Sequence, residues 1–171
     1  MANTYTIIAS NTLSSSAASV TFSSIPSTYT DLVVRISARA DTGDTFQNLR
    51  VQINGNTGTV YSNTRLEGNG ATASSARNSN ASFLASGEVD GSTATSNTFA
   101  SIEMYFPSYA ASINKPISTF AAQENNTTTA YIRGIAGLFS STTAISSIQF
   151  KPVADNFVSG SSFFLYGIKN S

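Results

Sequence analysis

The nine carboxylates are the residues of this sequence best suited to chemistry, because it contains no histidine and no cysteine. A glycosidase needs two carboxyl groups within about 5–10 Å of each other in a cleft. Nothing in the spacing of the glutamates indicates such a pair, so we expect them on solvated strand faces. The four glutamates are Glu67, Glu88, Glu103 and Glu124.

Two short segments contain residue types that bind ions, and each lacks the rest of a known site. Residues 41–44 (DTGD) offer two carboxylates to calcium, but an EF-hand loop needs more oxygen ligands and a distal glutamate. Asp and Gly also suit a tight turn, which is the interpretation we prefer. Residues 67–70 (EGNG) lack the Lys and Ser/Thr of a phosphate loop. The sequence therefore predicts no catalytic residue, no metal and no cofactor.

Tyrosines and arginines are the remaining candidates for recognition of a partner. Tyrosine rings stack on the apolar faces of sugars and add a polar tip, so a sugar-binding face is one hypothesis. Half-buried strand aromatics, or packing at a subunit interface, are the alternative. Arginines on solvated strand faces pair with acids across strands or contact a partner protein. The candidate interface residues are Arg35, Arg39, Arg50, Tyr61, Tyr105, Tyr109 and Tyr131.

These side chains belong to a chain with few charges. Charged residues make up 11% of the 171 residues, against about 25% in an average protein, so Ser, Thr and Asn must form most of the surface. The net charge is zero and no basic block occurs, which argues against binding to nucleic acid or to a membrane surface. No apolar run reaches the ~18 residues of a membrane span. The N-terminal residues lack the features of a cleaved signal peptide, so we expect synthesis in a cytoplasm.

The hydrophobic period along the chain is two, which is typical of β-strands. Val34, Ile36 and Ala38 alternate with Arg35, Ser37 and Arg39, as in a strand with one buried face and one solvated face. Residues 162–169, the last such segment, are apolar on both faces, which predicts a strand in the middle of a sheet. Segments with the same alternation are 49–53, 99–106 and 145–153.

The pattern weakens in the middle of the chain. Residues 67–81 are mostly Gly, Asn, Ser and Ala and predict an irregular surface loop, with a short helix at 71–76 as an open alternative. Gly134 and Gly137 are expected to mark bulges or close approaches. About nine short strands without an amphipathic helix predict an all-β, single-domain antiparallel β-sandwich over residues 1–171. A jelly-roll-like topology is preferred over an immunoglobulin-like or other sandwich.

Three segments resemble small structural proteins of tailed bacteriophages, including phages of cyanobacteria. The segments are residues 22–32 (FSSIPSTYTDL), residues 51–55 (VQING) followed by Tyr61, and residues 164–169 (FLYGIK). The resemblance covers both ends of the chain and much of its first half, whereas residues 67–98 resemble nothing we recognise. Its motifs are turns followed by strands, so they do not indicate a ligand.

The resemblance implies a virion component with a jelly-roll-like β-sandwich and no catalytic residues. Such proteins decorate the outside of capsids as cement proteins, commonly as trimers, or belong to tails and fibres. We accordingly expect a capsid decoration protein on the virion exterior. It would bind the major capsid protein, self-associate as a homotrimer, and bind neither nucleic acid nor a membrane. The alternative is a tail or tail-fibre domain that binds a host glycan or receptor. An enzyme such as a polysaccharide depolymerase ranks last.

Overall fold

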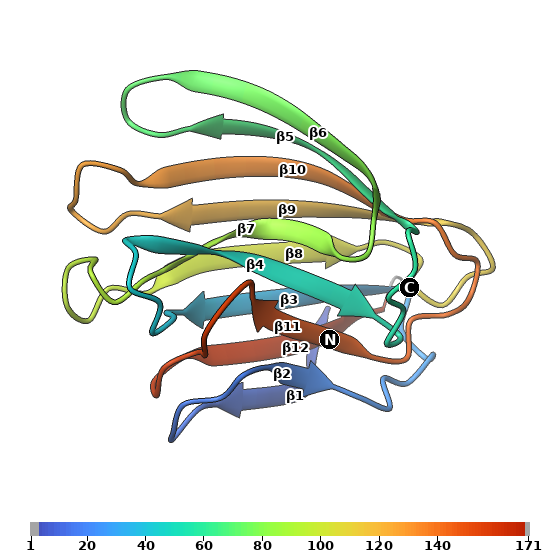
Figure 1. The fold of residues 1–171 in the computed structure, drawn as a ribbon. Coiled ribbons are helices and arrows are strands. Elements are labelled where there is room, and N and C mark those ends of the chain that lie inside the picture. The colour runs from blue at the N-terminus through green and yellow to red at the C-terminus, as the bar shows by residue number, and fades with distance from the viewer. Residues whose placement is uncertain (1–3, 170–171) are drawn as a thin grey trace.

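The protein is a sandwich of two β-sheets, seen in a computed structural model that describes residues 4–169 (Figure 1). The larger sheet has eight strands and the smaller sheet has four, and all paired strands are antiparallel. The predicted all-β, jelly-roll-like fold is therefore confirmed, with twelve strands where the sequence indicated about nine. No helix in the described part of the chain is long and apolar enough to cross a membrane.

The twelve strands occur in an order along the chain that differs from their order in the sheets. In the larger sheet the order is β1-β12-β3-β8-β9-β10-β5-β6, and in the smaller sheet it is β2-β11-β4-β7. The strands are β1 (Tyr5–Thr12), β2 (Val20–Phe22), β3 (Asp31–Ala38), β4 (Phe46–Ile53), β5 (Tyr61–Gly68), β6 (Ala73–Ala81), β7 (Leu84–Asp90), β8 (Ala100–Phe106), β9 (Lys115–Gln123), β10 (Tyr131–Phe139), β11 (Ile148–Pro152) and β12 (Ser162–Ile168).

The apolar core lies between the two sheets, and it extends from the strands around β3 to Leu84 of β7, Ile117 of β9 and Phe139 of β10. The alternation in β3 places Val34, Ile36 and Ala38 in this core, as the sequence predicted. Aromatic rings fill its centre, where the Phe163 ring centroid lies 5.8 Å from that of Phe150. β12 pairs on both sides, with β1 and with β3, so its predicted place inside a sheet is confirmed.

The segment predicted as an irregular loop, residues 67–81, is instead the end of β5 and the whole of β6. The alternative of a helix at 71–76 is also wrong. β6 is exposed along most of its length, so no apolar pattern reveals it in the sequence. It forms because the edge of β5 offers unpaired backbone groups, which β6 pairs from Ala73 to Ala81.

The two glycines of β10 differ in their surroundings. A methyl group added to Gly137 would lie 2.8 Å from Cδ1 of Leu84 on β7, so the predicted close approach is confirmed there. The same group on Gly134 would meet no atom within 4 Å, and the pairing of β10 has no register shift. The expectation for Gly134 is therefore wrong.

The smaller sheet does not cover the whole of the larger one. β7, its last strand, packs across β8, β9 and β10. β5 and β6 extend beyond β7 at the top of the view in Figure 1. This difference between the covered and the overhanging part of the larger sheet determines where charged and apolar side chains lie.

Candidate functional site

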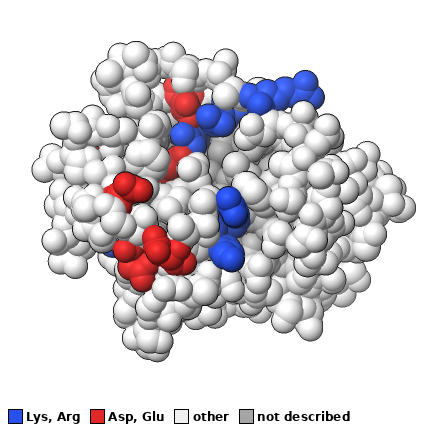
Figure 2. Space-filling view, viewed as in Figure 1, with Lys and Arg blue, Asp and Glu red and all other residues white. Residues whose placement is uncertain are grey.

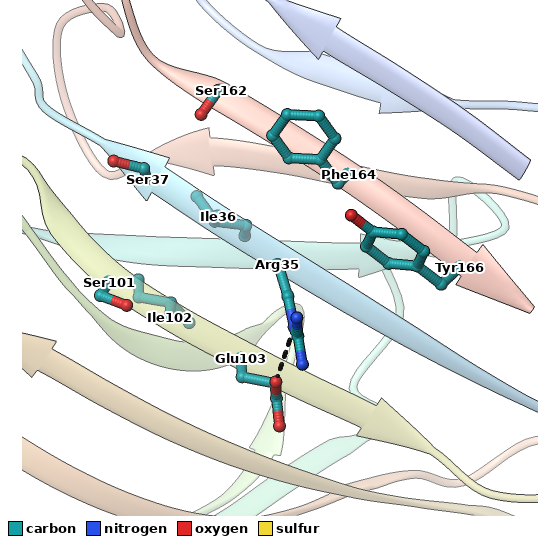
Figure 3. A pocket seen from close by; sticks show the side chains of 9 residues that line it. All are labelled: Arg35, Ile36, Ser37, Ser101, Ile102, Glu103, Ser162, Phe164 and Tyr166. Atoms are coloured by element: carbon teal, nitrogen blue, oxygen red, sulfur yellow. Dashed lines mark hydrogen bonds and ion pairs between the residues drawn. The ribbon is translucent and has the colours of Figure 1, made fainter. Parts of the chain in front are cut away.

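The face of the larger sheet that is turned away from the smaller sheet, here called the outer face, contains a hollow in the described surface. The hollow has a volume of about 540 Å³ and lies over β12, β3 and β8. Figure 3 shows Phe164 and Tyr166 projecting from β12 beside Arg35 of β3. Further lining residues are Ile36, Ser37, Ser101, Ile102, Glu103 and Ser162.

An ion pair lies on one side of this hollow. Nε of Arg35 donates to Oε2 of Glu103 at 2.9 Å, and both side chains are more than half exposed. The two residues are direct neighbours across β3 and β8. The Arg35 guanidinium also lies 5.9 Å from the ring centroid of Tyr5 and 6.0 Å from that of Tyr166. The hollow thus combines aromatic rings with exposed donors and acceptors.

A second feature of the outer face is the apolar patch, which consists of Leu66, Phe120 and Ile132. Their exposed fractions are 66%, 57% and 53%, so these large side chains project into solvent from β5, β9 and β10. Phe120 faces Gly134 across the sheet, and Gly134 faces Leu66 on the other side. The glycine between them leaves the surface flat enough for another protein to approach.

Behind the apolar patch, the inner face of the same strands has charged side chains. The ionic cluster consists of Arg65, Glu67, Glu88 and Arg133. Nε of Arg133 lies 2.6 Å from Oε2 of Glu67, and NH1 of Arg133 contacts Glu88 of β7. Arg65 binds Glu67 at 2.9 Å. Figure 2, viewed from the side of the smaller sheet, shows acidic and basic groups side by side below the lobe of β5 and β6.

The ionic cluster keeps Glu67 ionised. Burial by itself raises the pKa of Glu67, but the charges of Arg133 and Arg65 and hydrogen bonds from Arg65 and Ser74 outweigh it and hold the pKa below its ordinary value. Burial lowers the pKa of Arg133, and Glu67 opposes that effect. The prediction that Glu67 and Glu88 lie on solvated faces is wrong, because Glu88 is 1% exposed and Glu67 is held inward. Glu103 is exposed, as predicted.

Three of the predicted interface residues are buried, which corrects the expectation that they offer surface to a partner. The Arg39 guanidinium turns inward and donates to carbonyl oxygens of the 92–98 loop. The Tyr61 hydroxyl accepts a hydrogen bond from the Ile53 amide at 2.9 Å. The Tyr109 hydroxyl donates to the carbonyl of Pro26. Each side chain satisfies unpaired backbone groups in the interior, a demand that the strand pattern alone does not reveal.

The other four predicted residues are at least partly exposed, but they do not form one surface. Arg35 and Tyr105 lie on the outer face, where the Tyr105 hydroxyl donates to Asp31 at 2.8 Å. This hydrogen bond, with burial, raises the pKa of Tyr105. Arg50 lies on the opposite side of the sandwich, with its guanidinium 4.2 Å from the ring centroid of Phe83. Tyr131 packs edge-to-face against Phe46.

Residues 41–44, weighed as a calcium site, form part of the turn after β3. Oδ1 of Asp41 accepts a hydrogen bond of 2.7 Å from the Asn156 amide, so this carboxylate holds a neighbouring loop. Within residues 4–169, no group of three or more acidic, His or Cys side chains is arranged to hold a metal ion.

Comparisons with known proteins support the fold and do not identify a family. No protein-family model matches the chain, and no curated protein matches it significantly in sequence. The exo-inulinase of Aspergillus awamori is similar in structure, with a TM-score of 0.51 and 12% identity over 96% of this chain. This chain spans 29% of the inulinase chain. Galectin LEC-6 of Caenorhabditis elegans has a TM-score of 0.37 and 10% identity, over 98% of this chain and 96% of its own.

Most residues of the outer face were not predicted from the sequence. Phe164 and Tyr166 were assigned to a strand that is apolar on both faces, which is correct, but their face is only half covered. Leu66 lies between Arg65 and Glu67, and Ile132 precedes Arg133. This alternation of a large aliphatic residue with charges was the available signal. It shows that the two kinds of side chain face opposite ways without showing which kind faces inward.

Proposed function

We propose that this chain is a non-enzymatic structural protein of a bacteriophage virion, most simply a capsid decoration protein that binds the outer capsid surface. The observation that supports attachment to another protein is the apolar patch. Large apolar side chains exposed on three adjacent strands favour an interaction with another protein. The bacteriophage part of the proposal depends on the resemblance of residues 22–32, 51–55 and 164–169 to phage structural proteins.

The chemistry of the apolar patch suits a permanent contact with a protein partner. Its strands place Ser118, Ala122 and Ala136 among the large side chains, and no charged residue faces outward between them. A partner such as the major capsid protein would bury these apolar side chains at the core of the interface. Glu103, the neighbour of Phe120 across β8 and β9, would lie at the polar rim. Buried interfaces of about 1,200–2,000 Å² are the usual scale for stable contacts.

The edges of the larger sheet support self-association, for which we propose a homotrimer. β1 has no charged residue along Tyr5–Thr12, and β6 has Arg77 as its single charge. Unprotected edge strands pair readily with another chain unless they are covered. Several linked copies on one symmetry axis would add avidity to each contact with the capsid. The combined interfaces would hold neighbouring capsid subunits together against the pressure of the packaged DNA.

Copy number in purified virions, measured by quantitative mass spectrometry against the major capsid protein, tests this function. We expect a count comparable to that of the capsid subunit, and capsids without the protein should assemble but release DNA at a lower temperature. Absence from the particle, or equal heat stability without the protein, would overturn the proposal.

A triple variant, Leu66→Ser, Phe120→Ser and Ile132→Ser, tests the role of the apolar patch. We expect a folded protein that no longer enters virions, because the patch provides the contact with the capsid. Ile113→Ser is the matched control, since Ile113 is exposed to 48% in a loop outside the patch. Normal incorporation of the triple variant would exclude the patch as the attachment surface.

A second candidate function is a tail or tail-fibre domain that binds a host glycan. The observation in its favour is the hollow with Arg35, Glu103 and Tyr166, which offers an aromatic ring beside exposed polar groups. Copy number separates the two candidates, because tail proteins are far less abundant than capsid subunits in one virion.

A further inference from the structure

The strand register aligns small hydroxyl side chains into a transverse row on the outer face. Ser162 faces Ser37 across β12 and β3, and Ser37 faces Ser101 across β3 and β8. Thr12 on β1 and Ala122 on β9 continue this row at its two ends. We call these five residues the serine row. Adjacent strands are separated by about 4.8 Å, so the three serines alone span about 10 Å.

The neighbouring row, two residues along each strand, has larger side chains. Phe164 faces Arg35, Arg35 faces Glu103, and Glu103 faces Phe120. The serine row is therefore the floor of a shallow trough, and this second row is its wall. The hollow of about 540 Å³ lies in this trough.

The wall, together with Tyr166 two residues beyond Phe164 on β12, presents aromatic rings and polar groups. The rings of Phe164 and Tyr166 lie nearly parallel, 6.5 Å apart at an interplanar angle of 23°. Arg35 and Glu103 bind each other through one nitrogen and one oxygen, and both are more than half exposed. Their other donor and acceptor atoms have no further hydrogen bond among the described residues, so they are available to hydroxyl groups of a ligand.

The trough crosses the strands at right angles, which discriminates between kinds of ligand. β12, β3 and β8 each pair on both sides, so an extended peptide would find no backbone edge to join. Nucleic acid would require a basic surface, whereas Arg35 is neutralised by Glu103. A saccharide needs what the trough has, namely aromatic faces for its C–H groups and short hydroxyl side chains for its own hydroxyls.

We propose that the trough binds a neutral, unbranched oligosaccharide that lies across β12, β3 and β8. One sugar ring stacks on Tyr166 or Phe164, and the Arg35–Glu103 pair binds hydroxyls of the next unit. The fold alone does not indicate this ligand, because sandwiches of this type serve many functions. The inference does not depend on where the protein sits in a virion.

Isothermal titration of the full-length protein with cellohexaose, laminarihexaose and maltohexaose tests the proposal. A hyaluronan hexasaccharide is the charged comparison. We expect at least one neutral hexasaccharide to bind, and Tyr166→Ala to weaken that binding about tenfold or more through loss of the stacking ring. Ser37→Phe should abolish binding by filling the trough while leaving the ring in place. Gln149→Ala, on the smaller sheet, should leave the affinity unchanged.

Three outcomes would overturn the proposal. The first is that no neutral hexasaccharide binds at millimolar concentration, and the second is that the charged hexasaccharide alone binds. The third is that Tyr166→Ala and Ser37→Phe bind with the same affinity as the unchanged protein. Circular dichroism of each variant establishes that it is folded. A protein that is abundant in virions but binds no saccharide would reject this inference and leave the decoration function intact. A protein that binds saccharide but is absent from virions would do the reverse.

Discussion

The two halves of the larger sheet have opposite polarity. In β12, β3 and β8 the inner face is apolar, and the outer face bears serines and the exposed Arg35–Glu103 pair beside the rings of β12. In β10 and β5 the inner face is apolar at one end, where Phe139 and Tyr61 join the core. At the other end it bears the ionic cluster, and the outer face bears Leu66 and Ile132. The usual polarity of a sheet in a sandwich is therefore inverted at that end of the second half.

The inversion follows from the unequal size of the two sheets. β11 and β4 cover the first half completely, so water is excluded and only apolar side chains are stable inside. β7 is the last covering strand, and beyond it the inner face of β5 opens to the solvent at the side. The ion pairs of the ionic cluster lie at this open side of the sandwich. The apolar side chains of the same strands must then face outward, where a partner protein can cover them.

Removing the Arg133 side chain from the ionic cluster should give the largest difference in stability between the two halves. Glu88 has no hydrogen-bond donor within the described part of the chain, so the Arg133 charge is what compensates its burial. We expect Arg133→Ala to lower the free energy of unfolding by about 3–5 kcal/mol, because a buried carboxylate loses its partner. Arg35→Ala, in the exposed pair, should cost less than about 1 kcal/mol. Urea unfolding of both variants measures this contrast, and equal losses would contradict it.

A methyl group added to Gly87, at the boundary between the halves, should lower the free energy of unfolding somewhat less. Gly87 of β7 has a φ of +101°, and an added Cβ would lie 2.5 Å from Cβ of Ala121. Gly87→Ala should therefore destabilise the protein by about 2–4 kcal/mol, through overpacking and an unfavourable backbone conformation. Gly134→Ala is the control, since open space surrounds Gly134 on the outer face. Thermal unfolding of Gly87→Ala and Gly134→Ala tests this prediction. A Gly87→Ala variant as stable as the unchanged protein would show that β7 can shift away from β9.

The smallest expected effect depends on pH. The pKa of Glu67 is held below its ordinary value, so its ionised form adds stability above the unfolded-state pKa. That stability is lost as the pH falls through the folded-state pKa. We expect Glu67→Gln to cost about 1.5–3 kcal/mol at pH 7, as for hydrogen bonds to a charged group, and less at pH 3.

Denaturant unfolding at both pH values measures this change. Glu103→Gln, which alters the exposed pair of the first half, should change stability little at either pH. A Glu67→Gln penalty that is the same at pH 3 and pH 7 would show that charge is not what stabilises the second half.

The local pattern was sufficient to predict the first half of the sheet. In β3, β4 and β8 the apolar residues of each alternation face inward, so Val34, Val51 and Ile102 were correctly assigned to the core. The same pattern identified an all-β sandwich. β6 was not predicted because Ala73–Ala81 contains no apolar residue larger than alanine and no period of two, and its strand state depends on the edge of β5.

Which face of a strand is inward was decided by the tertiary structure. A period of two shows that Leu66 opposes Arg65 and Glu67, but burial depends on whether another sheet covers that face. The same limit explains Arg39, Tyr61 and Tyr109, whose polar atoms turn inward to satisfy backbone groups of other segments. The sequence by itself determined the amphipathic strands and the turns, because these depend on neighbours along the chain, and their number and spacing indicated a sandwich. The serine row, the ionic cluster and the apolar patch exist only once strands distant in sequence are placed in register.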